Sequence, residues 1–125
     1  MPTAKDVVLS FLEQINGKKD GFSVAVKRWF TPETVFHIPG VEAVVGPDAA
    51  IALMDNLVAS TGASIVKIEN VAVAADGQIV LTERLDTLFD EDGNAMGEIA
   101  LAGVFEVSAE GKIIRWTEYF DPSSH

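Results

Sequence analysis

Three charged residues, Arg84, Asp86 and Glu118, combine side-chain types and spacing that could carry acid–base chemistry. Arg84 and Asp86 stand two positions apart in the run 80–88, and side chains two apart on a strand point to the same side. Glu118 shares a strand face with the apolar residues Ile114, Trp116 and Phe120 near the end of the chain. If that face points inward, a carboxylate enters the core, where it is tolerated only when paired and hydrogen-bonded. Arg84 is the natural partner.

A guanidinium between two carboxyl groups would form a chemically coherent unit. Arg84 can donate two-pronged hydrogen bonds to Asp86 on one side and to Glu118 on the other. Two buried carboxyl groups that share one cation tend to hold one proton between them, which provides an acid and a base at neutral pH. Such a pair can protonate an oxygen while it activates water. The same spacing also fits a solvated charge pair on the outer face of an antiparallel sheet.

A histidine, His37, is the other titratable candidate. It lies in the apolar segment 35–39 and could act as a base or hold a water molecule, or it could be a structural residue. His125 stands at the end of the chain, so the two histidines have poor spacing for a metal site and no metal is predicted. The acidic stretch 90–93 predicts a solvated hairpin turn rather than a calcium loop.

The elements that must position these residues change in character along the chain. Apolar spacing and start signals predict three helices in the first half and a short strand at Val35–Ile38. The second half has β-branched runs separated by tight turns at 76–77, 92–93 and 110–111. The predicted helices are Thr3–Ile15, Ser23–Phe30, ended by the pair 31–32, and Ala49–Ala59; the further strands are Ser64–Ala75, Gln78–Phe89, Ala95–Val107 and Lys112–Phe120. This order predicts an α+β fold, with the helices on one face of a mostly antiparallel sheet, in a single domain over residues 1–125.

Composition and charge exclude several classes of function. The chain has 125 residues, no cysteine and a formal net charge of -10, which repels phosphate backbones and anionic membranes. Neither nucleic acid nor a membrane is therefore expected as a partner. No apolar stretch reaches the roughly 20 residues of a membrane span and no signal peptide is recognised, so a cytoplasmic location is expected. Without cysteine there is no disulfide, thiolate metal site or cysteine nucleophile.

Large apolar side chains could line a cavity next to the charged residues. About half of them are expected to contact a ligand and the others to belong to the core. The candidates are Trp29, Met54, Leu57, Leu88, Phe105, Trp116 and Phe120.

The segments Glu83-Arg84-Leu85-Asp86 and 116–121 resemble the limonene-1,2-epoxide hydrolase family, within the wider nuclear transport factor 2-like and ketosteroid isomerase-like superfamily. The resemblance covers nearly the whole chain. It implies a cone-shaped domain whose curved sheet wraps a deep pocket closed by three helices, and a homodimer formed through the sheet. It also implies epoxide opening in one step, without a cofactor or a covalent intermediate.

The family's site residues map onto this chain one by one. Asp86 matches the general acid, Arg84 the bridge, and Glu118 the Asp that helps to deprotonate water. Polyether-forming epoxide hydrolases of the superfamily resemble this chain in using an Asp and a Glu. Val35 and His37 match the Tyr and Asn that hold the water; His37 can replace one hydrogen bond, whereas Val35 cannot replace a phenol.

These features support one main hypothesis and two alternatives. The first is a cofactor-independent epoxide hydrolase of small lipophilic epoxides, with His37 as a possible water ligand and Val35, Trp116 and Phe120 at the substrate. The second is a proton-transfer isomerase or cyclase that resembles ketosteroid isomerase or the polyketide cyclases. The third is a non-catalytic binding protein in which the charged residues form a structural salt bridge.

Overall fold

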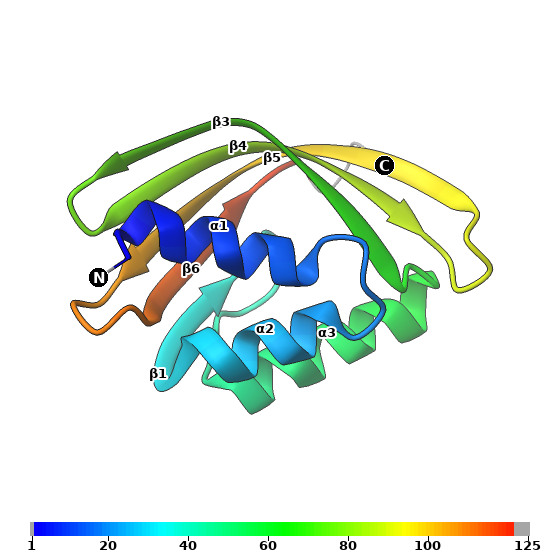
Figure 1. Cartoon of the computed structure of the whole chain (residues 1–125). Helices are drawn as coiled ribbons and strands as arrows, with labels where there is room; N and C mark the ends of the chain where they lie inside the picture. Colours follow the sequence, from blue (N-terminus) through cyan, green and yellow to red (C-terminus); the bar gives the residue numbers. More distant parts are fainter. Residues whose placement is uncertain (1, 122–125) are drawn as a thin grey trace.

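The computed structural model describes residues 2–121, which form a curved six-stranded sheet with three helices on its concave side (Figure 1). Neighbouring strands are antiparallel except β1 and β6, which run parallel. In sheet order the strands are β2 (Val44–Val45), β1 (Phe30–His37), β6 (Ile113–Tyr119), β5 (Ala95–Val107), β4 (Ile79–Phe89) and β3 (Ile65–Asp76). The prediction of an α+β fold with a mostly antiparallel sheet is confirmed.

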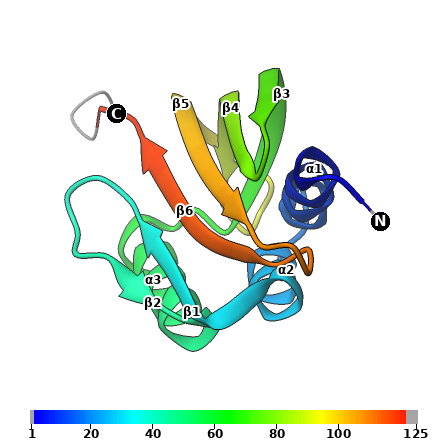
Figure 2. The ribbon, with the colours of Figure 1, turned by 90° about the vertical axis from the view of Figure 1, so that its left-hand side faces the viewer.

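The helices are α1 (Ala4–Ile15), α2 (Gly21–Trp29) and α3 (Pro47–Thr61). The first begins with a capping box, in which Thr3 and Asp6 each accept the other's backbone N–H at 3.1 Å. Figure 2 shows α1 lying beside the β3 side of the sheet, whereas α3 lies beside β1 and β2. The helices thus close the space that the curved sheet leaves open.

Aromatic rings fill the core between α1 and the sheet. Phe11 of α1 meets the Trp116 ring of β6 edge-on, with ring centroids 5.1 Å apart. The ring of Phe105 of β5 stacks on the Trp116 ring, with centroids 5.2 Å apart and an interplanar angle of 16°. The packing of Trp116 therefore fixes the position of β6 two residues before the Glu118 carboxylate.

The second helix and the first strand differ from the prediction. The helix ends at Trp29, and the chain continues directly as β1, so Thr31 and Pro32 lie inside a strand instead of ending a helix. Proline is tolerated there because the pairing of β1 with β6 shifts register between Phe30 and Val35. The buried Thr34 hydroxyl donates to the carbonyl of Ile113 at 2.5 Å within this irregular stretch and ties the two strands together.

A register shift also changes the start of β6. The predicted alternation put Ile114 on the inward face, but Ile113 is fully buried and Ile114 only half-buried. The shift between β5 and β6 leaves Ile114 out of the pairing, with Val107 opposite Ile113 and Glu106 opposite Arg115. From Trp116 onward the alternation is as predicted.

Two further features lie outside the prediction or the described residues. The short strand β2 and the parallel pairing of β1 with β6 were not predicted. His125 lies outside residues 2–121. Within those residues, no helix is long and apolar enough to cross a bilayer.

Candidate active site

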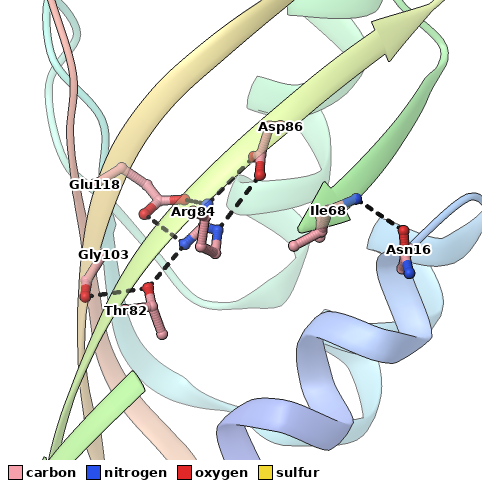
Figure 3. A network of polar contacts seen from close by, with 7 residues as sticks. All are labelled: Asn16, Ile68, Thr82, Arg84, Asp86, Gly103 and Glu118. Atoms are coloured by element: carbon pink, nitrogen blue, oxygen red, sulfur yellow. Dashed lines mark hydrogen bonds and ion pairs between the residues drawn. The ribbon is translucent and has the colours of Figure 1, made fainter. Parts of the chain in front are cut away.

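Arg84 lies between Asp86 and Glu118 on the inner face of the sheet (Figure 3). Its Nη1 and Nη2 donate to the two Glu118 oxygens at 3.1 and 2.5 Å. Its Nε and Nη2 donate to the two Asp86 oxygens at 3.5 and 3.3 Å. Arg84, Asp86 and Glu118 are only 3%, 9% and 7% exposed. The three charges therefore form a buried unit and not a solvated pair on the outer face.

The residue opposite this unit on β5 is Gly103, which pairs with Thr82 on one side and with Glu118 on the other. A Cβ at this position would lie 2.5 Å from Glu118 Oε2 and 2.7 Å from Arg84 Nη1. The Thr82 hydroxyl accepts from Arg84 Nη1 at 3.3 Å and donates to the Gly103 carbonyl at 3.4 Å. Gly103 thus provides the space in which the guanidinium and the Glu118 carboxylate meet.

Burial controls the protonation of the two carboxyl groups. It raises the pKa of Asp86 and of Glu118 above their ordinary values, and the charge of Arg84 offsets only part of this effect. The Asp86 charge raises the Glu118 pKa further, whereas the Trp116 indole lowers it. Burial alone would lower the pKa of Arg84, but the charges of Glu118 and Asp86 outweigh it, so that pKa is raised and Arg84 stays charged.

The charge balance favours one bound proton. With both carboxyl groups ionised, the unit of Arg84, Asp86 and Glu118 has a net negative charge, whereas one proton makes it neutral. A neutral unit is cheaper to bury. The arrangement can therefore present one carboxylic acid and one carboxylate to the same bound molecule.

These three residues lie in the wall of a cavity of about 450 Å³, which is within the range of about 300 to 1,000 Å³ for small-molecule sites. Most of the other lining side chains are apolar and come from α1, α2, α3 and the inner face of the sheet. Ile68 of β3 is among them, and its backbone N–H donates to the Asn16 side chain at 2.8 Å (Figure 3). This contact joins the end of α1 to the edge of the sheet and closes one side of the cavity.

Comparison with known proteins places this geometry in a family. The family model described as limonene-1,2-epoxide hydrolase catalytic domain matches residues 2–124. The chain belongs to the limonene-1,2-epoxide hydrolase family. No curated protein matches the sequence significantly.

Solved structures support the same assignment. An epoxide hydrolase from M. tuberculosis, described as similar to limonene-1,2-epoxide hydrolase, is 26% identical, with a TM-score of 0.73 over 94% of this chain and 82% of that chain. A candidate SnoaL-like polyketide cyclase from Jannaschia is 20% identical, with a TM-score of 0.75 over 94% and 85%. A Catenulispora acidiphila protein with a ketosteroid isomerase-like fold, solved with trimethylamine, is 13% identical, with a TM-score of 0.76 over 95% and 88%. The last two show the shared fold alone.

Five of the predicted substrate contacts do line the cavity of this limonene-1,2-epoxide hydrolase family member. They come from α3, β4, β6 and the residue after β6: Met54, Leu57, Leu88, Trp116 and Phe120. Phe105, another of the large apolar candidates, belongs to the fully buried core and does not line the cavity.

The two residues matched to the family's water site do not line the cavity. Val35 and His37 are exposed on β1, whereas Phe36 and Ile38 point inward and line the cavity. Because side chains alternate along a strand, the two pairs cannot both face the same side. The family's Tyr and Asn positions, matched through the following proline, therefore do not bring a polar side chain to the charged residues here.

Trp29 is also placed differently from the prediction. It lies at the end of α2 beside a separate surface hollow between α1, α2 and β3, and does not line the cavity of the charged residues. Its ring meets Phe11 edge-on at 6.1 Å and lies 4.5 Å from the Arg28 guanidinium. Trp29 therefore packs against the outside of the core.

Sequence reasoning missed Gly103, Phe36 and Ile38. A glycine inside a predicted strand can signal a close approach by another group, so residue 103 carried a usable signal. Phe36 and Ile38 carried none, because apolar residues occupy both phases of that short strand.

The space at Gly103 can be tested with Gly103→Ala. The added methyl must displace the Glu118 carboxylate or the Arg84 guanidinium, so we expect a loss of about 1–3 kcal/mol in the free energy of unfolding, measured by urea denaturation. Ala109→Ser adds one atom in the exposed turn that follows the same strand and should change stability by less than about 0.5 kcal/mol. Equal effects of the two changes would show that the close approach at Gly103 is unimportant.

The raised pKa of Asp86 predicts how stability depends on pH. The folded state binds this proton more tightly than the unfolded chain, so the contribution to stability is complete below the ordinary value of 3.8 and is lost as the pH rises through the folded pKa. Asp86→Asn resembles the protonated group at every pH. The stability of this variant relative to the natural protein should therefore increase from about pH 4 to about pH 7 in urea titrations.

Asp90 provides a control of opposite sign. Hydrogen bonds from the backbone of Asn94 and neighbouring groups lower its pKa, so its contribution is present above 3.8 and lost at lower pH. Asp90→Asn should therefore be less stable than the natural protein at neutral pH, with the difference shrinking in acid. The same trend in both variants would contradict the burial argument for Asp86.

Proposed function

We propose that this protein is a cofactor-independent epoxide hydrolase that adds water in one step to a small lipophilic epoxide. The observation that carries the proposal is the buried Arg84 bridge between Asp86 and Glu118 in the wall of an apolar cavity. Membership of the limonene-1,2-epoxide hydrolase family and the 26% identity to the M. tuberculosis epoxide hydrolase support the same chemistry.

Asp86 is the general acid in this proposal. Its hydrogen bonds to Arg84, at 3.3 and 3.5 Å, are longer than those of Glu118, at 2.5 and 3.1 Å. The stronger charge-assisted bonds go to an ionised carboxylate, so the shared proton is assigned to Asp86. This proton passes to the epoxide oxygen while the carbon–oxygen bond breaks, and that oxygen leaves the reaction as a hydroxyl group.

Glu118 is the general base. A water molecule attacks the epoxide carbon, its oxygen forms the new bond, and one of its protons passes to Glu118. The product is a vicinal diol. Asp86 is then ionised and Glu118 protonated, and a proton transfer between them through water restores the starting state. Arg84 touches both groups and stabilises whichever of them is charged.

The cavity supports a compact, lipophilic substrate. Its volume of about 450 Å³ and its walls of Leu, Ile, Val, Met and aromatic side chains fit a monoterpene-sized or aryl epoxide. Neither polyanions nor long charged chains match this lining.

One observation favours a second candidate, a proton-transfer isomerase or cyclase whose product contains no added water. At this end of β1 the cavity is lined by Phe36 and by Ile38, the residue after the strand, and neither can hold a nucleophilic water molecule. A buried water needs two to four polar partners, and the strand segment that holds the water in the family supplies none of them to this cavity. An acid and base pair that acts on the substrate alone has no such requirement.

Diol release from terpene, cyclohexene and styrene epoxides tests the hydrolase proposal. We expect turnover by the natural protein, and a loss of at least about 100-fold in Asp86→Asn, because removal of a general acid costs about 10²–10⁴-fold. Asp90→Asn, with the same exchange in a hairpin turn, should retain the activity. The diol formed in oxygen-18 water should carry the label.

Other results of these measurements would contradict the hydrolase proposal or favour one of the alternatives. Diol formation by Asp86→Asn at the natural rate would remove Asp86 from the mechanism. Conversion without label would favour the isomerase or cyclase. A folded protein that binds these epoxides without converting them would favour the binding protein.

We further propose a homodimer formed through the convex face of the sheet. Leu81 and Tyr119 are 50% and 57% exposed there, and Ala102 lies between their strands, so that the strands β4 to β6 present apolar side chains beside the charged Glu83. A second copy of the same surface would remove these side chains from water.

Sedimentation velocity measures the oligomeric state and so tests the proposed homodimer. The natural protein should have twice the 13.4 kDa mass of the chain, and Leu81→Lys should shift it toward the monomer. Val45→Lys, at a residue of β2 that is 56% exposed, should leave the mass unchanged. A monomeric natural protein at micromolar concentration would refute the dimer.

A further inference from the structure

The indole N–H of Trp116 is a buried donor without a hydrogen bond. Trp116 is 4% exposed, and its Nε1 atom is out of reach of solvent and has no partner at ordinary hydrogen-bond geometry. Buried N–H groups in proteins are nearly always paired, so an unpaired one calls for an explanation. The residue lies on β6, two positions before Glu118 and on the same face.

The position of the indole ring is fixed by its neighbours. Phe36 stacks on it at 4.5 Å and 27°, and Phe105 stacks on it at 5.2 Å and 16°. Phe11 meets it edge-on at 5.1 Å. A ring packed in this way cannot turn its N–H toward a different partner, so the direction of the donor is set by the core.

Glu118 is the hydrogen-bond acceptor on the same face of β6, and both residues line the cavity. The indole lowers the pKa of the Glu118 carboxyl, whereas the shift of the Asp86 pKa arises from burial and Arg84 alone. The other groups close to Glu118 are Arg84 and Asp86 of β4; Gly103 of β5 has no side chain. The remaining charged residues of the cavity lining, Lys18, Lys19, Asp20 and Asp55, come from α3 and the segment between α1 and α2.

This arrangement is asymmetric in a way that matters for acid–base chemistry. Arg84 bonds to both carboxyl groups and therefore favours ionisation of each. A second cation would promote ionisation of both and remove the acid. A neutral N–H directed at one carboxyl group favours the charged form of that group only.

We propose that Trp116 is a positioning residue that decides which carboxyl group carries the proton, because its indole N–H is directed at Glu118 and not at Asp86. Glu118 is thereby kept as the base, and the proton is left on Asp86. The kinetic consequence rests on the proposed epoxide hydrolase function, whereas the effect on Glu118 protonation does not.

The first test is an NMR titration of the whole protein, which needs no substrate. The chain has two tryptophans, so its indole N–H signals are readily assigned by single replacement. The Trp116 signal should move with the ionisation of Glu118, followed through a ¹³C-labelled carboxyl group, and the Trp29 signal should not. In Trp116→Phe the apparent pKa of Glu118 should rise by about one unit, which is a tenfold change in its proton affinity.

A closer replacement separates the N–H from the ring. In a Trp29→Phe background, Trp116 is the remaining tryptophan, and its indole can be replaced by benzothiophene, which keeps the bicyclic shape but has sulfur in place of N–H. This protein should show the same rise in the Glu118 pKa, with packing preserved. The Trp29→Phe protein itself is the matched control, because Trp29 does not line the cavity.

The kinetic test is the pH profile of kcat/KM for an epoxide substrate. Without the N–H, the acidic limb should move to higher pH, so that the rate falls about tenfold below that limb and recovers above it. An unchanged Glu118 titration together with a uniform loss at every pH would overturn the proposal and leave Trp116 a packing residue. Absence of turnover in the natural protein would refute the hydrolase function, and the NMR titration would still decide the role of Trp116.

Discussion

The free-energy cost of burying a guanidinium with two carboxyl groups constrains the whole structure. Each of these charges costs several kcal/mol to remove from water, so Arg84 is tolerated only where hydrogen-bond acceptors surround it. Asp86 and Glu118 supply most of them, and the hydroxyl of Thr82 supplies another. These acceptors come from β4 and β6, with the side-chain-free Gly103 of β5 between them. The register of three strands is thus tied to one cation.

The apolar lining has two effects at once. It offers a bound molecule mainly apolar contacts, and it raises the pKa of both carboxyl groups by removing them from water. Substrate preference and acid strength therefore cannot be varied independently in this cavity. A polar substitution that widened the range of ligands would also hydrate the carboxyl groups and weaken the tendency to keep a proton at neutral pH.

Local periodicity predicted the parts of the structure that depend on neighbouring residues. The first helix followed from apolar spacing, and the shared face of Arg84 and Asp86 followed from strand alternation. The inward position of Glu118 followed from its apolar neighbours on β6. All of these depend on contacts within a few positions of the chain.

The predictions that were wrong concern residues whose positions depend on contacts between distant segments of the chain. The phase of β1 is set by its pairing with β6, and since Val35, Phe36 and Ile38 are all apolar, the sequence could not show that Phe36 and not His37 faces the cavity. Ile114 was assigned inward because the register shift against β5 is not visible in a single strand. Trp29 has a side chain typical of a ligand contact, but the direction of α2 places it beside Phe11.

The parallel pairing of β1 with β6 also determines when the cavity can form during synthesis. The Thr34 hydroxyl bonds to the carbonyl of Ile113, 79 positions later, and β6 lies between β1 and β5 in the sheet. Until the last strand leaves the ribosome, β1 has no central partner and Arg84 lacks the Glu118 carboxylate. Closing so long a loop is entropically costly and slow. The charged centre therefore cannot form before β6 has been synthesised, and a nascent chain that stops before β6 has Arg84 without its second counter-ion.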